Sequence, residues 1–286
     1  MTKKKSSRTA PSNSMEFKYF SHNGKLKPIG QAVVPLTSIE YQYGFGVYES
    51  LRVVHGAIYF VEQHIERLME SARIIGLAHP FSPDDVGGAL QELVEKTDSG
   101  TYNLKILLIG GNEPDLFIVP LNPHFPEKKL YRDGVHTVTY EYERAFPHAK
   151  TLNMLQSYLA YKKAKDAGAY DALLINRDGA ITEGTRTNFF CIKGKVLYSP
   201  PEAHILLGVT RKIVLKVARE NGFDVVEKEL RPGELSRYDG AFLTSTSSGI
   251  MPVASVGEFR FGARPNVLDE LSNAFDTFVK NCGGKL

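Results

Sequence analysis

The sequence predicts an α/β protein of two lobes that share a cleft. Its 286 residues are many for one small domain and few for three. From Ala32 onward, strand-like and helix-like segments alternate along the chain. Proline and asparagine concentrate in residues 120–126, where the hydrophobic periodicity disappears, and this predicts a linker. We therefore expect a small N-terminal α/β domain at residues 15–120, an interdomain linker at 121–130 and a large C-terminal domain at 131–286.

The composition is that of an ordinary globular protein, and it argues against two classes of partner. Hydrophobic residues make up 42% of the chain and charged residues 23%, and no apolar run is long enough to span a bilayer. The net charge of the whole chain is +3, but four cations lie near its start. Without these four, the rest of the chain is slightly acidic. Nucleic-acid binding requires many cations that contact phosphates. We therefore predict neither a membrane nor a nucleic-acid partner.

The cysteines and the first residues bear on the compartment. Cys191 and Cys282 are too few for a disulfide framework and lack metal-site spacing, which predicts a reducing cytoplasm and no metal site. Residues 1–14 contain Lys3, Lys4, Lys5 and Arg8 among small polar residues, without the apolar run of a secretory signal. We expect a disordered basic tail there. An organelle-targeting role for this tail stays open.

The N-terminal lobe is predicted to contain a hairpin that is followed by a long helix. β-Branched and aromatic residues flank the turn His55-Gly56. Apolar residues then recur at helical spacing from Ile65 to Ile75. Ser82, as an N-cap before a proline and two acids, predicts a second helix. The expected elements are strands at 48–54 and 57–60, helices at 61–76 and 83–94, and strands at 102–109 and 115–119.

The C-terminal lobe is predicted to mix strands with two helices. Gly168 and Gly222 each follow a helical pattern and are expected to end those helices. The second pattern places Ile213, Val214 and Val217 on one face. The expected elements are strands at 135–142, a helix at 152–167, a hairpin that turns at 176–179, strands at 188–192 and 196–198, a helix at 210–221 and a strand at 241–243.

Two segments of this lobe have the groups that bind anions. Gly208, Val209 and Thr210 stand at the start of a helix, so backbone N–H groups, the helix dipole and a hydroxyl can converge on a phosphate. Residues 244–249 offer hydroxyls and N–H groups in a turn-like run at a strand end. Taken alone, the first segment also fits a plain helix cap.

Two charged residues are further candidates, each with a plain alternative. Arg67 lies one turn beyond His64 and off the apolar face of its helix, where its guanidinium can either reach a phosphate or stay solvated. Glu183 lies at a hairpin end before a glycine, and periodicity leaves its exposure open. Spacing alone decides neither case.

Several strings of residues occur together in the order and spacing of one known family. A helix carries His64-x-x-Arg67-Leu68 after the run 43–49. The C-terminal lobe then contains the strings Lys150-Thr151-Leu152-Asn153, Tyr170 to Leu174, Thr182 to Phe189 and Leu206 to Arg211. From about Ala32 to Val253, the chain resembles the pyridoxal-5′-phosphate (PLP) enzymes of fold type IV, the class IV aminotransferases. The resemblance implies a two-lobe fold like that of D-amino-acid aminotransferase, with PLP as the cofactor.

The resemblance also implies roles for single residues. Lys150 matches the lysine that carries PLP as a Schiff base and moves the proton at the substrate Cα. Glu183 matches the carboxylate that faces the pyridine nitrogen and keeps it protonated. Leu206 matches the residue that packs on the ring face. The phosphate-binding residues implied in this way are Arg67, Val209, Thr210, Ser245 and Thr246.

The substrate side departs from both better-known subgroups. Met154 stands where branched-chain aminotransferases have a tyrosine, yet residues 110–120 lack the Arg-x-His pair with which D-amino-acid enzymes hold the substrate carboxylate. Lys105 stands roughly where branched-chain enzymes have an arginine, and Arg186 adds a cation near Glu183. We favour Arg186, because its planar fork binds a carboxylate at two points. The expected substrate-side residues are Tyr43, Tyr48, Lys105, Arg186 and Ser247, the last through neighbouring backbone N–H groups.

The sequence therefore predicts a PLP-dependent aminotransferase that acts on an α-amino acid, of the D-amino-acid or branched-chain type, and a 2-oxo acid. The resemblance implies a homodimer in which N-terminal lobes complete the partner's site. Aminodeoxychorismate lyase, which eliminates pyruvate with the same cofactor, stays open because some members have a similar acid at the position of Glu49. A cofactor-free binding protein on the same scaffold is the remote alternative, and the complete set of Lys150, Glu183 and Arg67 argues against it.

Overall fold

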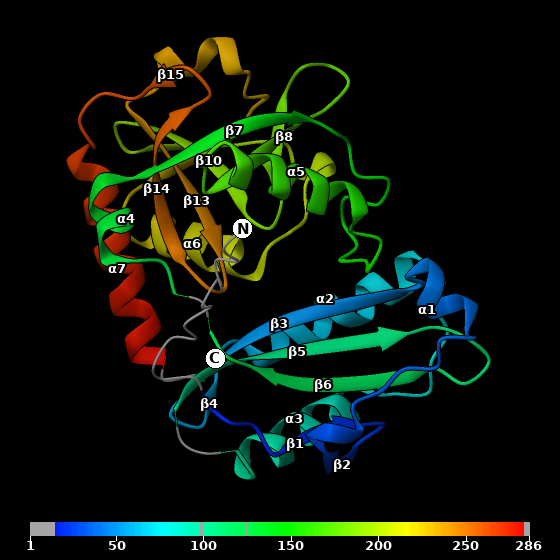
Figure 1. Cartoon of the computed structure of the whole chain (residues 1–286). Coiled ribbons are helices and arrows are strands. Elements are labelled where there is room, and N and C mark those ends of the chain that lie inside the picture. The colour runs from blue at the N-terminus through cyan, green and yellow to red at the C-terminus, as the bar shows by residue number, and fades with distance from the viewer. Residues whose placement is uncertain (1–14, 98–99, 124, 283–286) are drawn as a thin grey trace, which may run out of the picture.

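The protein has two β-sheets flanked by helices, which confirms the predicted α/β class (Figure 1). The computed structural model describes residues 15–97, 100–123 and 125–282. Residues 19–121 supply a sheet of six strands, and residues 135–260 supply one of nine. The tail at residues 1–14, which we expect to be disordered, lies outside the described residues.

The N-terminal sheet is antiparallel, with the strand order β2-β1-β6-β5-β3-β4. The predicted hairpin is confirmed, because His55 and Gly56 adopt φ values of 49° and 85°, as a two-residue turn between strands requires. The strands are β1 (Tyr19–His22), β2 (Lys25–Pro28), β3 (Gly46–Val54), β4 (Ala57–Ile58), β5 (Thr101–Ile109) and β6 (Asp115–Leu121), and the short helices η1 (Ile29–Gln31) and α1 (Ile39–Tyr43) lie between β2 and β3.

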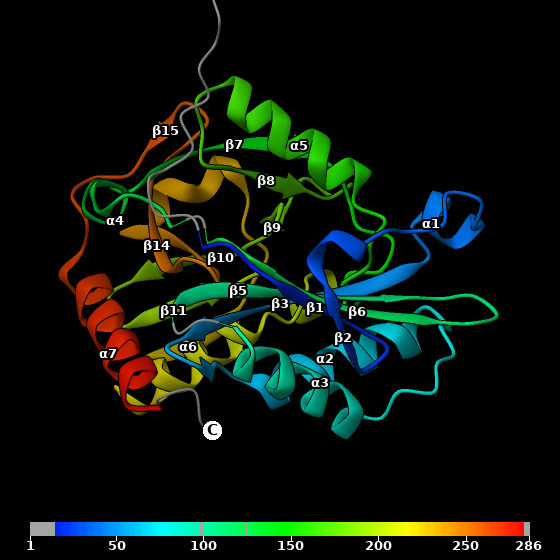
Figure 2. The same cartoon turned by 60° about the horizontal axis from the view of Figure 1, so that its bottom comes forward.

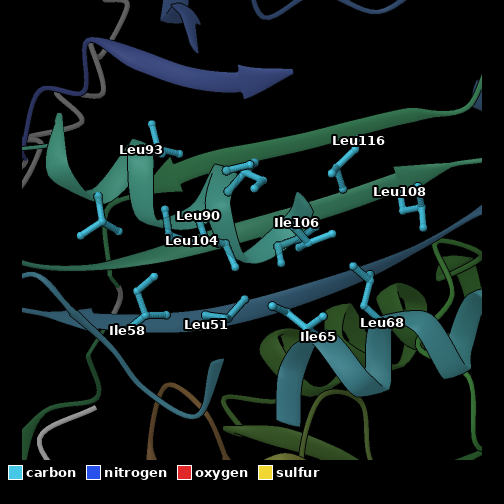
Figure 3. Close-up of a cluster of buried hydrophobic side chains, with 14 of the residues drawn as sticks. Leu51, Ile58, Ile65, Leu68, Leu90, Leu93, Leu104, Ile106, Leu108 and Leu116 are labelled. Carbon is cyan, nitrogen blue, oxygen red and sulfur yellow. The ribbon is translucent and has the colours of Figure 1, made fainter. Parts of the chain in front are cut away.

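Helices α2 (Val61–Ile74) and α3 (Pro83–Glu95) lie side by side on one face of this sheet (Figure 2). The predicted cap of α3 is confirmed: the Ser82 hydroxyl accepts the Asp85 N–H, and the Asp85 carboxylate accepts the Ser82 N–H. Figure 3 shows leucine and isoleucine side chains of both helices packed against alternating residues of β5. This packing fixes α2, which carries Arg67, against β3.

The C-terminal sheet closes on itself. Its strand order is β12-β11-β10-β13-β14-β7-β8-β9, with β15 beside β14. The residue pair Glu183 and Asn188 also joins β9 to β10, so that six strands form a ring. The strands are β7 (Val135–Glu141), β8 (Asp171–Ile175), β9 (Ile181–Gly184), β10 (Asn188–Lys193), β11 (Val196–Ser199), β12 (Asp224–Glu227), β13 (Gly240–Ser245), β14 (Gly249–Val256) and β15 (Phe259–Arg260).

Helices α6 (Val209–Glu220) and α7 (Asn266–Cys282) pack together on the C-terminal sheet. Val214 and Val217 of α6 share a buried cluster with Leu271 and Phe275 of α7. Gly222 follows α6 with a φ of 76°, as the sequence predicts. The helices after β6 are α4 (Lys128–Asp133), α5 (Leu155–Asp166), η2 (Glu202–His204), α6 (Val209–Glu220), η3 (Pro232–Arg237) and α7 (Asn266–Cys282). Among the described residues, no helix combines the length and the apolar character needed to cross a membrane.

The segment that carries Lys150 adds a short piece of strand to the free edge of β3. The Tyr48 N–H donates to the Lys150 carbonyl at 2.9 Å, and the Leu152 N–H donates to the Gly46 carbonyl at 2.8 Å. Gly46 leaves no room for a side chain, because a Cβ there would lie 2.7 Å from the Leu108 carbonyl oxygen and 2.8 Å from Leu152 Cδ1. The Lys150 N–H donates to Ser71 Oγ at 3.0 Å. The backbone of Lys150 is thus bound to the N-terminal sheet and to α2.

Most predicted element boundaries shift by one or two residues in the structure, and the differences near Lys150 and in the expected linker matter most. The helix expected at 152–167 begins at Leu155, because the residues before it pair with β3 instead of continuing a helix. Strand β6 runs to Leu121, one residue into the expected linker, and α4 begins at Lys128 inside it.

Candidate active site

A cavity of about 400 Å³ opens where residues of both sheets meet at the free edge of β3. Residues 43–75 form one wall, and residues 142–246 form the rest. Most of the residues that the sequence singles out line it, namely Tyr43, Tyr48, Arg67, Lys150, Glu183, Arg186, Leu206, Val209, Thr210, Ser245 and Thr246. Lys105 and Ser247 are not part of this lining.

The amine of Lys150 has the electrostatic surroundings of a nucleophile. Its Nζ lies 4.5 Å from the centre of the Tyr48 ring. Burial, together with the charges of the Arg67 and Arg144 guanidinium groups, lowers the pKa of Lys150 to about 7. An amine with this pKa is substantially uncharged at neutral pH, so it can attack a carbonyl carbon.

Glu183 is a buried acid on β9. Only 3% of it is exposed, because β9 pairs with β10 at this residue to close the ring. One carboxylate oxygen accepts a hydrogen bond from Arg144 Nη1 at 3.1 Å, and the other accepts the Leu206 N–H at 3.1 Å. Burial raises the pKa of Glu183, and the Arg144 charge opposes that shift.

Arg67 is held by an acid whose structural role the sequence did not reveal. Its Nε and Nη2 donate to the two carboxylate oxygens of Glu49 at 2.6 and 2.8 Å. Glu49 is fully buried on β3 and also lies 2.7 Å from His64 Nδ1. Burial disfavours the charged form, but Arg67 and His64 outweigh it and hold the pKa of Glu49 well below its usual range. Arg67 is therefore not a solvated surface arginine, and Glu49 sets the direction in which it points.

The N-terminus of α6 opens on the cavity. Gly208 is the N-cap, and Val209 and Thr210 begin the helix with their backbone N–H groups free of helical partners. A Cβ at Gly208 would lie 2.2 Å from Asn188 Oδ1, so this close approach requires glycine. The site has the donors and the helix dipole that bind an anion.

Residues with hydroxyl groups at the end of β13 and in the turn before β14 also line the cavity. Ser245 and Thr246 line it, while Ser247 lies behind them with its Oγ 3.3 Å from Ser245 Oγ. The Oγ1 of Thr244 is buried without a hydrogen-bond partner and also borders the cavity. Buried hydroxyl groups in folded proteins are seldom left without a partner, so this hydroxyl fits a polar ligand in the cavity.

The two cations predicted for the substrate carboxylate occupy different places. Arg186 borders the cavity as an exposed residue, with its guanidinium carbon 4.5 Å from the centre of the Tyr161 ring. Lys105 instead places its Nζ 3.6 Å from the centre of the Tyr48 ring. Burial lowers the pKa of Lys105. Of the two, Arg186 is the one that reaches the cavity.

Arg144 is another cation at the cavity, and the sequence analysis missed it. It belongs to the irregular segment between β7 and Lys150, which has neither periodicity nor a motif. An arginine a few residues before the candidate lysine was the only signal available.

These groups fit a cofactor that has an aldehyde, a basic ring nitrogen and a phosphate. Lys150 supplies an amine, and Glu183 supplies a buried acid. The α6 N-terminus, the hydroxyl turn and Arg67 supply donors for a phosphate. PLP has all three features, and the unpaired Thr244 hydroxyl borders the same cavity. The fold and the site therefore define a PLP-dependent enzyme.

Comparison with known proteins gives the family. The family model "Amino-transferase class IV" matches residues 46–256. A D-alanine aminotransferase of Bacillus licheniformis is 34% identical over 247 residues, which cover 82% of this chain and 87% of that protein. A putative branched-chain-amino-acid aminotransferase of Methanocaldococcus jannaschii is 30% identical over 253 residues, with coverage of 82% and 86%. The chain belongs to the class IV aminotransferase family.

Solved structures confirm the fold type. The branched-chain amino acid aminotransferase from Escherichia coli is 26% identical with a TM-score of 0.83, over 92% of this chain and 95% of that chain. The branched-chain aminotransferase from Thermoproteus uzoniensis has a TM-score of 0.84 at 24% identity, over 93% and 95%. Another branched-chain amino acid aminotransferase, solved with pyridoxamine 5′-phosphate, has a TM-score of 0.87 at 23% identity. The last two likenesses concern the fold alone. The predicted architecture and the prediction of a PLP-dependent aminotransferase are confirmed.

Proposed function

We propose that Lys150 carries the cofactor and moves a proton at the substrate Cα, while Glu183 faces the pyridine nitrogen. Leu206 packs on the ring in this proposal. The phosphate is held by Arg67, Val209, Thr210, Ser245 and Thr246. The observation that supports these roles is that all of these residues line one cavity of about 400 Å³.

The residues of the cavity suit the chemistry of amino-group transfer. Bound PLP supplies an electron sink for negative charge at the substrate Cα. With a pKa of about 7, Lys150 can take up a proton and return it in a later step at neutral pH. Glu183, as an anion, keeps a proton on the pyridine nitrogen. Tyr48, which is 7% exposed, covers one side of the amine and shields it from bulk water.

We propose amino donors of the alanine or branched-chain type, with a 2-oxo acid as acceptor. One relative is named a D-alanine aminotransferase and another a putative branched-chain aminotransferase, at 34% and 30% identity. Arg186 remains our proposed carboxylate-binding residue, because it borders the cavity and Lys105 does not. Backbone N–H groups near Ser247 are less favoured for the same reason.

We also propose that the protein works as a homodimer. Three aromatic residues at the cavity, Tyr43, Phe45 and Phe146, are 74%, 39% and 50% exposed. Apolar side chains gathered around a site commonly mark an interface, and a second copy would cover them. Light scattering after size-exclusion chromatography should give twice the chain mass of 31.8 kDa. A single-chain mass at working concentration would contradict this proposal.

We also propose that the protein works in a reducing cytoplasm. Cys191 and Cys282 are both free, which supports this compartment. We also propose the division into a small domain at residues 15–120, a linker at 121–130 and a large domain at 131–286, although β6 ends at Leu121 and α4 begins at Lys128, both within that linker.

The decisive experiment combines cofactor loading with an amino-donor panel. Protein reconstituted with PLP should show cofactor absorbance and should retain the cofactor covalently after borohydride reduction, whereas Lys150→Ala should not. The protein is then assayed with a 2-oxo acid as the amino acceptor. The candidate substrates compared are D- and L-alanine, the branched-chain amino acids and a chorismate-derived substrate. Covalent loading in the Lys150→Ala protein would move the lysine elsewhere. Release of pyruvate without amino transfer would support the lyase instead.

A further inference from the structure

We propose that Arg144 is a positioning residue that keeps Glu183 charged and fixes the backbone before Lys150. This inference rests on the proposed function, because it takes Glu183 as the partner of the pyridine nitrogen. It concerns a residue that no sequence pattern marks.

The geometry of Arg144 joins the two groups. Its Nη1 donates to Glu183 Oε1 at 3.1 Å, and its Nη2 donates to the Ala149 carbonyl at 2.6 Å. Ala149 is fully buried and immediately precedes Lys150. One guanidinium group therefore bridges the acid on β9 and the peptide unit that leads into Lys150. Its side chain is 20% exposed and borders the cavity.

The charge of Glu183 depends on this contact. The groups that face its carboxylate are the Arg144 guanidinium, the Leu206 N–H and the Lys150 amine. Within the part of the chain that the structure describes, Arg144 is the cation in salt-bridge contact with Glu183. Burial favours the neutral acid, so loss of Arg144 leaves the N–H of Leu206 and a partly charged amine to oppose protonation. A neutral Glu183 no longer holds a proton on the pyridine nitrogen.

Arg144 contributes both a positive charge and a planar group with two contacts, and two substitutions distinguish these contributions. Arg144→Gln removes the charge and disrupts both contacts. Arg144→Lys keeps the charge, but one ammonium group lacks the planar fork that spans Glu183 and the Ala149 carbonyl. A substrate-binding role for Arg144 would instead act mainly on KM.

The chain offers a matched control next to this residue. Arg177 donates from Nε to Glu143 at 2.8 Å, in an ion pair whose arginine side chain is 79% exposed. Glu143 is the residue before Arg144, so Arg177→Gln removes an arginine from the same region without touching the cavity lining.

The test is nitrogen-15 NMR of holoenzyme loaded with ¹⁵N-labelled PLP, together with steady-state kinetics. At neutral pH, Arg144→Gln should shift the pyridine nitrogen toward the unprotonated position, while Arg144→Lys and Arg177→Gln keep the parent signal. Both Arg144 variants should lose about tenfold or more in kcat, with KM within about twofold, because proton transfer and its geometry are impaired. If Arg144→Gln does not fold, Arg144→Lys still tests the bridge through kcat.

Contrary results have distinct meanings. A parent-like nitrogen signal in Arg144→Gln, when Glu183→Gln has lost that signal, would overturn the role of Arg144 and leave that of Glu183 intact. A parent-like signal in Glu183→Gln would overturn the proposed role of Glu183, and this inference with it. A raised KM with unchanged kcat in either Arg144 variant would show that Arg144 binds substrate instead.

Discussion

Replacing Glu49 by glutamine should destabilise the protein strongly, although the two side chains have nearly the same shape. Glu49 is 0% exposed and the Arg67 side chain is 9% exposed, so water screens their ion pair very little. Glutamine leaves one acceptor where the fork of Arg67 now meets two, and it leaves the guanidinium charge unpaired. Removal of one member of such a buried pair costs about 3–5 kcal/mol of the free energy of unfolding.

Urea unfolding of the apoprotein, followed by circular dichroism, measures this loss directly. The chain contains no tryptophan whose fluorescence could follow unfolding, so circular dichroism is the suitable signal. The control is Glu70→Gln on α2, the helix that carries Arg67; it breaks an exposed pair with Arg73 and should leave the unfolding midpoint unchanged. A loss below about 1 kcal/mol for Glu49→Gln would refute the reasoning, because the buried pair would then behave like a surface pair.

The same variant has a pH signature. The pKa of Glu49 in the folded protein is lowered from the ordinary value of 4.5, so its stabilising contribution is fully present above about pH 4.5. That contribution is lost as the pH falls toward the folded-state pKa. The stability gap between parent and Glu49→Gln should therefore narrow below about pH 4.5, and a gap that widened there would contradict the assignment.

Three other outcomes follow from the site. In apoprotein, modification of Lys150 by an amine-directed reagent should rise with pH around a midpoint of about 7, and a midpoint near the ordinary 10.5 would contradict the burial argument. Arg186→Ala should lower kcat/KM for the best donor about tenfold, equivalent to about 1.4 kcal/mol, whereas loss only in Lys105→Ala would identify the other cation. Gly208→Ala should weaken PLP binding at least about tenfold, because its Cβ would meet Asn188 Oδ1 at 2.2 Å, and an unchanged dissociation constant would contradict this.

Local patterns were sufficient for the elements whose cause is local. The turn at His55-Gly56 and the cap at Ser82 depend on neighbouring residues, and both formed as predicted. The start of α5 depends instead on Leu152, which pairs with Gly46 from a distant part of the chain. No periodicity within residues 150–155 reports such a partner.

The residues of the candidate site also divide into those that local motifs locate and those that depend on distant contacts. Motif strings located Lys150 and Glu183, and both line the cavity. The burial of Glu183 was left open, because it arises from closure of the ring between β9 and β10. The contacts of Glu49 and Arg144 were missed, since each depends on a side chain that folding brings from another element.

The strand-like pairing of residues 150–152 with β3 constrains how small molecules enter and leave. The Tyr48 and Leu152 amides both donate across this seam, at 2.9 and 2.8 Å. A hinge that parted the sheets here would have to break both bonds and would pull Lys150 away from Ser71. Small molecules therefore have to enter and leave past the surrounding loops, while the backbone of Lys150 stays bound to β3. Hydrogen exchange at these two amides should stay slow during turnover.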